Sequence, residues 1–199
     1  MSTYAKAETL VGAVAAPLGW VRSVVLVVAF SLLVALAAQV AVPLPGTPVP
    51  VTLQTFAVLL TGALLGSRLG ALALVFYLFE GAAGLPFFTR GAGGYLYLVS
   101  SPTAGYLFAF PFAAFVTGYL AERGWDRRFL TAALAMALGS LVILAGGWAW
   151  LAVLTRSASA AFASGVALFV VGDIVKVALA AAALPAGWAL LRTRGHGTD

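Results

Sequence analysis

Long apolar runs separated by short polar or Pro/Gly-rich breaks make up most of this chain of 199 residues. A helix of about 20 residues crosses the hydrocarbon core of a bilayer, and tilting or re-entrant pieces absorb deviations from that length. The pattern therefore predicts an all-α membrane protein, built as a bundle of six transmembrane helices with Pro/Gly-rich loops on the external side. The predicted spans lie near residues 22–42, 52–67, 69–80, 103–121, 129–153 and 172–191.

Composition agrees with a membrane protein. Hydrophobic residues make up 63% of the chain and charged residues 9%, against about 25% charged in ordinary soluble domains. A transmembrane barrel would need alternating segments of about ten residues, and the long Ala/Leu/Val runs do not alternate. The chain has no cysteine and one histidine, His196, in its polar C-terminal tail. We therefore expect no metal site and no cofactor.

The basic residues predict the topology. Eight of them fall on one side of the predicted spans, and the residues on that side are Lys6, Arg22, Arg68, Arg123, Arg127, Arg128, Arg192 and Arg194. Only Arg90 and Arg156 fall on the other side. Because cytoplasmic loops are enriched in Lys and Arg, both termini are expected in the cytoplasm. The predicted organisation is a cytoplasmic segment over 1–21 without a removable signal peptide, a transmembrane domain over 22–191 and a cytoplasmic tail over 192–199.

An acid and a base, Asp173 and Lys176, lie inside the apolar run that ends at Leu191. A charge in contact with lipid costs roughly 3 kcal/mol or more, so intramembrane charges mark binding sites or transport paths by default. Their i, i+3 spacing puts both side chains on one helical face, where they can pair or share a ligand. The alternative is an ion pair that only fixes two helices together.

The last apolar run is too long for one straight helix. Residues 160–191 would form a helix of about 48 Å, against a hydrocarbon core of about 30 Å. A break is expected at Gly172–Asp173, because Gly tolerates a bend and Asp is a favoured N-cap. The final helix would then begin at Asp173, and its N-terminal amides together with Lys176 would suit a carboxylate.

Two further stretches are expected on the external side. The first has four prolines between Pro43 and Pro50, which favour an extended path. Irregular backbone at membrane depth survives only when it is buried or lines a cavity. Thr52 and Gln54 follow directly, and the Gln54 amide can both donate to and accept from an amide-like or ureido group. A hydrogen bond between helices is the alternative role for Gln54.

The second stretch, over residues 81–97, combines five glycines with aromatic rings that include Phe87 and Phe88. Flexible backbone with flat apolar side chains suits a lid that closes over a small ligand, although an interfacial aromatic belt would use the same rings. Glu80 and Arg90 border this loop, and their roles stay open. The chain has no Walker A sequence, so it is not expected to hydrolyse ATP itself.

Small residues at Ser31 and Ala35 in the first span have the spacing that allows close approach of another helix. These two positions are the candidate docking site for a membrane partner.

Several of these motifs, in this order, resemble the BioY family of biotin-specific substrate-binding (S) components of energy-coupling-factor (ECF) transporters. The matching runs are Val49-Pro-Val-Thr-Leu-Gln-Thr-Phe56, Gly81-Ala-Ala-Gly-Leu-Pro-Phe-Phe88, Ser101-Pro-Thr-Ala-Gly-Tyr106 and Gly172-Asp-Ile-Val-Lys176. The resemblance covers roughly residues 25–190. The chain departs from the family pattern at Val171 and at Ser101.

This resemblance implies six helices in a prokaryotic cell membrane and an external biotin site closed by loops. It also implies two partners, a transmembrane coupling protein and a pair of cytoplasmic ATPases. The carboxylate of biotin would be handled by Asp173 and Lys176. The positions Gln54, Tyr106 and the lid residues Phe87, Phe88 and Arg90 are carried over as further binding candidates, and Thr52 joins them as the polar neighbour of Gln54.

Three alternatives stay open from the sequence. The first is an S component for another small carboxylate or vitamin. The second is an intramembrane enzyme that uses Asp173 and Lys176 as acid and base, against which stands the lack of a second acid, a Cys or a Ser-based triad. The third is a structural subunit in which the charged pair only joins helices.

Overall fold

The helices follow the apolar runs of the sequence in the computed structural model, which describes residues 9–14 and 19–194. The helices that correspond to the predicted spans are α2 (Gly19–Gln39), α3 (Gln54–Leu65), α4 (Ser67–Ala82), α6 (Ala104–Glu122), α7 (Phe129–Thr155) and α9 (Val170–Arg194). Of these, α2, α6, α7 and α9 are long and apolar enough to cross a membrane. The described chain is thus almost entirely helical, with four candidate membrane spans.

Helices α3 and α4 are shorter than the bilayer core. They have 12 and 16 residues, or about 18 and 24 Å, and the single residue Gly66 joins them. The backbone of Gly66 has φ 87°, a left-handed value that favours glycine. The two short helices therefore form a tight pair, and α3 does not extend as far as the longer spans do.

Short elements complete the described chain. Strands β1 (Ala41–Val42) and β2 (Val51–Thr52) pair antiparallel, so the proline-rich stretch is the loop of a small hairpin. The other short elements are α1 (Leu10–Val14), η2 (Thr89–Gly91), α5 (Tyr95–Ser100), η3 (Trp125–Arg127), α8 (Ala158–Phe162) and the π-helical turn η4 (Ala163–Ala167).

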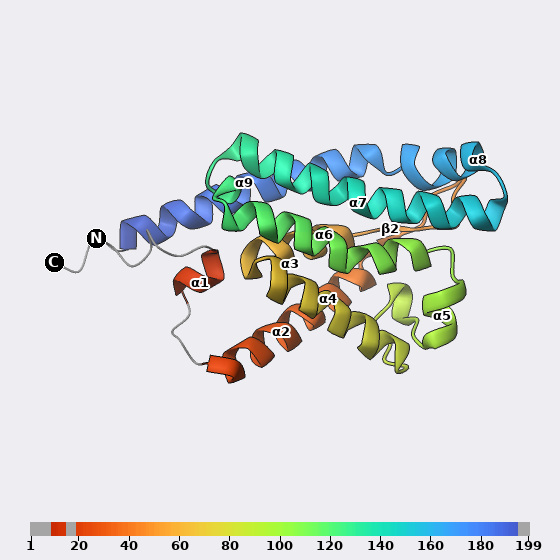
Figure 1. Cartoon of the computed structure of the whole chain (residues 1–199). Coiled ribbons are helices and arrows are strands. Elements are labelled where there is room, and N and C mark those ends of the chain that lie inside the picture. The colour runs from red at the N-terminus through yellow and green to blue at the C-terminus, as the bar shows by residue number, and fades with distance from the viewer. Residues whose placement is uncertain (1–8, 15–18, 195–199) are drawn as a thin grey trace.

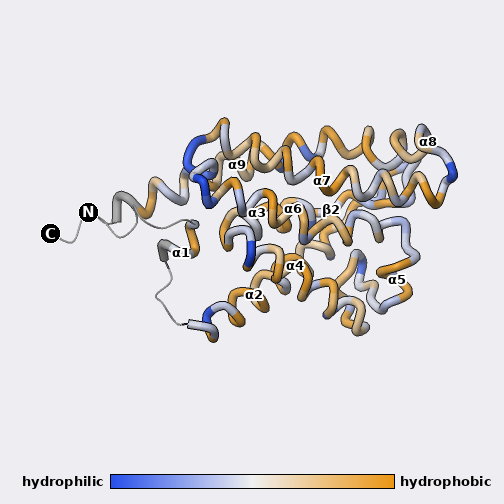
Figure 2. Tube along the Cα trace, in the orientation of Figure 1, coloured by the Kyte–Doolittle hydropathy of each residue, from blue (hydrophilic) through white to orange (hydrophobic). Residues whose placement is uncertain are grey.

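Helix α6 occupies the centre of the bundle (Figure 1). It packs on α7 on one side and on α3 and α4 on the other, while α9 lies along α7 and α2 lies along α4. Most residues of the helices are apolar (Figure 2), and large apolar side chains such as Trp20, Leu36, Leu130 and Val171 are exposed. An apolar exterior of this kind suits contact with lipid.

The connections that carry the predicted cytoplasmic charges gather at one end of the molecule. The start of α2, the α3–α4 junction and the α6–α7 connection lie at the same end as α1 (Figure 1). The α7–α8 connection and α5 lie at the opposite end. Lys6, most of the predicted N-terminal segment and the end of the predicted tail lie outside the described residues.

The predicted break in the last apolar run exists, but it lies earlier than Gly172–Asp173. Helix α8 and the π-helical turn end at Ala167, and α9 begins at Val170. Asp173 is in the first turn of α9, and its backbone N–H donates to the Phe169 carbonyl at 2.9 Å. The prediction that Asp173 is the N-cap was therefore wrong, because the π-helical turn accommodates the bend before Gly172 is reached.

Glycines allow the central helices to approach closely. A Cβ atom on Gly62 of α3 would overlap the Ala114 carbonyl and the Thr117 side chain of α6. On the other side of α6, Gly105 faces Gly146 of α7 in the same way. Small residues at helix contacts are a common basis of packing in membranes, where no hydrophobic effect drives helices together.

Two carboxylates, the half-buried Glu122 and the buried Asp126, tie the helix ends together at the end that carries most basic residues. The Glu122 carboxylate accepts hydrogen bonds from the backbone N–H and the hydroxyl of Ser67, at 2.6 and 3.0 Å. Asp126, 1% exposed, accepts from Trp188 Nε1 at 2.6 Å. These bonds connect α6 with α4, and η3 with α9.

Gly62→Ala is expected to destabilise the bundle by about 1–3 kcal/mol, because the added methyl group forces α3 away from α6. Thermal unfolding in detergent measures the effect. The control is Gly187→Ala on α9, where the new Cβ would meet only Leu10 at ordinary contact distance, 3.4 Å. Equal melting temperatures for the two variants would contradict the close α3–α6 contact.

A second expectation concerns pH. Burial raises the pKa of the Asp126 carboxyl above its ordinary value of 3.8, against the opposing effects of Trp188 Nε1 and Arg127. A raised folded-state pKa means that the stability contributed by this group is present below pH 3.8 and is lost as the pH rises through the folded-state pKa.

Asp126→Asn keeps an acceptor for Trp188 but does not titrate. The native protein should therefore lose stability relative to Asp126→Asn as the pH rises from about 4 to about 8. Melting temperatures of both proteins across this range test the expectation. A difference that stays constant with pH would contradict it.

Candidate functional site

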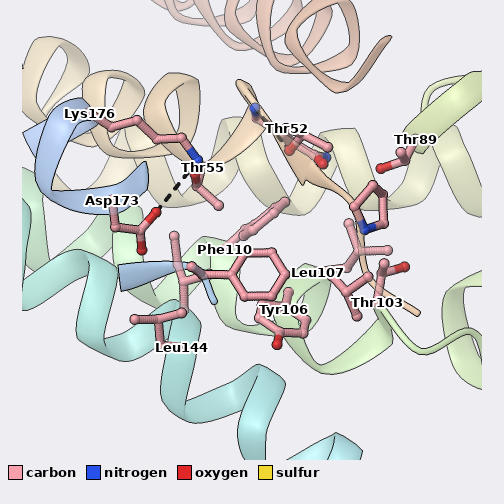
Figure 3. A pocket seen from close by; sticks show the side chains of 15 residues that line it. Thr52, Thr55, Thr89, Thr103, Tyr106, Leu107, Phe110, Leu144, Asp173 and Lys176 are labelled. Carbon is pink, nitrogen blue, oxygen red and sulfur yellow. Dashed lines mark hydrogen bonds and ion pairs between the residues drawn. The ribbon is translucent and has the colours of Figure 1, made fainter. Parts of the chain in front are cut away.

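A small, partly open cavity lies between the β-hairpin and the helices α3, α6, α7 and α9 (Figure 3). Its volume is about 40 Å³, enough for a few water molecules. A larger ligand needs the surrounding side chains or loops to move. The lining residues are Val49, Pro50, Thr52, Gln54, Thr55, Thr89, Thr103, Tyr106, Leu107, Phe110, Ile143, Leu144, Phe169, Asp173 and Lys176.

The charged pair predicted from the last apolar run lies on the wall of this cavity. Lys176 Nζ is 3.5 Å from Asp173 Oδ1, and both residues are 9% exposed. The i, i+3 spacing thus places them on one face of α9, as predicted, and they pair with each other. The separation is long for a charge-assisted hydrogen bond, which is typically 2.7–2.9 Å.

Hydroxyl groups from two other helices lie closer to Lys176 and Asp173 than these two residues lie to each other. Lys176 Nζ donates to Thr55 Oγ1 of α3 at 2.8 Å, and Ser140 Oγ of α7 donates to Asp173 Oδ2 at 2.5 Å. An ammonium group has three N–H donors, so these contacts leave Lys176 able to meet a further acceptor. Neither Thr55 nor Ser140 was predicted as a site residue: Thr55 lies within the run Val49–Phe56 but is not distinguished there, and Ser140 lies in no motif.

Gln54, the second polar group predicted for the site, is fixed by a buried tyrosine. Its Nε2 donates to the Tyr77 hydroxyl of α4 at 2.5 Å, and that hydroxyl donates to the Phe87 carbonyl at 3.0 Å. Gln54 is 3% exposed and Tyr77 is fully buried. The amide therefore makes the predicted bond to another helix and also lines the cavity, and its role toward an amide-like or ureido group stays a prediction.

Thr52 and Tyr106 also line the cavity. Thr52 Oγ1 accepts from the Gln54 backbone N–H at 3.2 Å and so orients the start of α3. The Tyr106 hydroxyl donates to the Gly165 carbonyl in the π-helical turn at 2.6 Å. Its ring remains beside Leu107 and Phe110 on the apolar side of the cavity (Figure 3).

The three predicted lid residues do not line the cavity, whereas their neighbour Thr89 does. Phe88 is fully buried between Tyr77, with the ring centroids 5.7 Å apart, and Tyr97, at 5.5 Å. Phe87 is half-buried and Arg90 is exposed. In this arrangement Phe88 anchors the loop to α4 and α5.

Gln39, at the end of α2, bonds the same loop from the other side. Its Oε1 accepts from the Gly91 backbone N–H at 2.8 Å, and its Nε2 is 3.3 Å from the Phe88 carbonyl and 3.4 Å from the Pro86 carbonyl. We refer to residues 81–94 as the lid loop. Gln39 thus ties the lid loop to α2, a contact that no motif in the sequence predicts.

The remaining candidates lie away from the cavity. Ser31 and Ala35 are buried within the chain, at 0% and 5% exposure, and α2 packs on α3 and α4. A partner could reach these two side chains only if α2 moved from its neighbours. Glu80 Oε2 is buried without a hydrogen-bond partner among the described residues.

Together these features define a class of protein. A charged pair, a buried amide and several hydroxyls surround a small cavity near one end of a helical bundle whose exterior is apolar. Among the described residues no group of three or more His, Cys, Asp or Glu could hold a metal ion. The arrangement is that of a membrane protein that binds a small polar ligand, and it offers a cation to an anionic group.

Comparison with known proteins identifies the family. The model of the BioY family matches residues 5–193. A probable biotin transporter BioY of Pyrococcus horikoshii is 42% identical over 159 residues, which are 80% of this chain and 91% of that protein. The biotin transporter BioY of Rhizobium etli is 38% identical over 184 residues, covering 87% of this chain and 98% of that protein. The chain belongs to the BioY family.

A solved structure has the same fold. It is the crystal structure of the S-component for biotin from an ECF-type ABC transporter, with a TM-score of 0.76 and 23% identity. The match covers 88% of this chain and 92% of that one.

Proposed function

We propose that this protein is the membrane-embedded biotin-binding (S) component of an ECF-type transporter and serves biotin uptake. The single observation that carries the proposal is Lys176 on the wall of a small cavity, with its ammonium group bonded to Thr55 and only loosely to Asp173. Family membership supports biotin as the ligand, since the relatives in Pyrococcus horikoshii and Rhizobium etli are named as biotin transporters.

The polar groups of the cavity match the two ends of biotin. Lys176 meets the valerate carboxylate, and Gln54 and Thr52 meet the ureido group. The side chains of Tyr106 and Phe110 cover the fused rings. Each polar group of the ligand needs a partner, because an unpaired buried group costs about 1–3 kcal/mol.

Binding requires an opening, because the cavity has a volume of only about 40 Å³. We propose the lid loop as the moving part. It contributes Thr89 to the cavity wall and contains Gly84, Gly91 and Gly94, which all have positive φ. Phe87, Phe88 and Arg90 then act through the position of this loop, and Gln39 holds it closed.

The partners proposed are a transmembrane coupling protein and two cytoplasmic ATPases, which hydrolyse ATP for the S component. The protein crosses a prokaryotic cell membrane six times, with α3 and α4 completing the four longer spans, and both termini are cytoplasmic. The end that carries most basic residues would then face the cytoplasm. Helix α2 stays the proposed docking helix, with its exposed residues Leu32, Leu33 and Leu36 reached before Ser31 and Ala35.

Lys176→Ala should lower the affinity for biotin by about 10- to 100-fold, the loss expected for a charge-assisted hydrogen bond of about 1.5–3 kcal/mol. Equilibrium binding to the detergent-purified protein measures it. Arg68→Ala removes an exposed cation at the α3–α4 junction and should bind like the native protein.

Other outcomes separate the alternatives. No biotin binding by the native protein would contradict the proposal, and a competition screen with other carboxylate vitamins would then identify the ligand class. Lower stability of Lys176→Ala, with binding unchanged, would favour the structural role. Conversion of a bound ligand would favour an enzyme.

Gln39→Ala should speed biotin dissociation by about fivefold to tenfold, because the lid loop loses bonds worth about 1 kcal/mol in net terms. A chase with unlabelled biotin measures the rate. Gln39→Glu keeps the acceptor for Gly91 and loses the donor, so its rate should lie between those of the native protein and Gln39→Ala. Unchanged dissociation from Gln39→Ala would show that this loop does not gate the site.

A further inference from the structure

Asp173 lies between two spaces and lines both of them. On one side is the cavity that Lys176 lines. On the other is a groove of about 390 Å³ between α7 and α9, bordered by exposed residues such as Leu141 and Ile174. Asp173 and Leu144 line both spaces, whereas Ser140 lines the groove.

The two carboxylate oxygens have different partners. Oδ2 accepts from Ser140 Oγ at 2.5 Å, and Oδ1 is 3.5 Å from Lys176 Nζ. The short bond therefore points away from the lysine, toward the groove side. Ser140 is 6% exposed, so its bond to the carboxylate is largely screened from solvent.

A free carboxylate so near an ammonium group would be expected to close on it, to about 2.8 Å. Such an ion pair would compete with a ligand for Lys176. We propose that Ser140 is a positioning residue that holds Asp173 back from Lys176, so that the lysine stays available to the carboxylate of the ligand. This inference rests on the proposed function.

The hydroxyl also stabilises the occupied site. When Lys176 turns to an anionic ligand, Asp173 loses part of its counter-charge in a region that borders lipid. An uncompensated buried charge is strongly unfavourable. Ser140 donates a hydrogen bond to Asp173 both without and with the ligand. The Ser140 hydroxyl carries no charge, so it does not repel the ligand.

The test compares two ligands that differ in charge, biotin and its uncharged amide, biotinamide. Ser140→Ala should lower the affinity for biotin about tenfold and that for biotinamide by less than about twofold, because only the carboxylate competes with Asp173 for the lysine. Ser140→Thr keeps the hydroxyl, has room for its methyl group in the groove, and should restore biotin binding.

A double-mutant cycle tests whether Ser140 acts through Asp173. In an Asp173→Asn background, Ser140→Ala should have no further effect on biotin affinity. Thr117→Val serves as the control, because it removes a fully buried hydroxyl that bonds only within α6. If Ser140→Ala does not fold, Ser140→Cys keeps the shape and weakens the donor.

Equal losses for biotin and biotinamide would overturn the inference and leave Ser140 a structural residue. A tenfold loss of biotin affinity on adding Ser140→Ala to the Asp173→Asn variant would overturn it as well. A native protein that binds neither ligand would instead contradict the proposed function.

Discussion

The structure depends on how a membrane bundle accommodates one carboxylate and one ammonium group near the start of α9. Both groups are costly to remove from water, and attraction between them repays that cost only with good geometry and further hydrogen bonds. Here the 3.5 Å separation of Asp173 and Lys176 is poor as an ion pair. The hydroxyls of Ser140 and Thr55 supply the missing bonds from α7 and α3. The charged pair is therefore bonded to both neighbouring helices, and Lys176 also lines the cavity.

Close packing of the helices makes this arrangement possible. Glycines on α3, α6 and α7 bring the backbones into contact, which leaves little room for rearrangement at the centre of the bundle. The lid loop, which we propose as the moving part, lies at the end beside α5 and is held there by Gln39 and by the ring of Phe88. A closely packed centre with one opening loop would suit capture of a small solute.

Much of the fold and part of the site could be predicted from the sequence. The apolar runs predicted the main helices, because lipid exposure leaves a strong local signal. The spacing of Asp173 and Lys176 predicted their pairing, and the proline stretch predicted irregular backbone before Gln54. The start of α9 was misplaced because a π-helical turn has no clear sequence signature. Ser140, Thr55, Tyr77 and Gln39 were missed because their roles depend on contacts between helices that are distant in the chain. Phe88 was assigned to the ligand, although its fully buried ring serves the loop.

The positions at which α3 and α9 begin have a further consequence. Since α3 begins at Gln54 and α9 at Val170, two helix N-termini lie at the cavity wall. The peptide dipoles of a helix place about half a positive charge at its N-terminus. The backbone itself thus adds positive partial charge at the cavity wall, beside the lysine charge. Side-chain substitutions cannot remove that contribution, because it comes from the course of the chain.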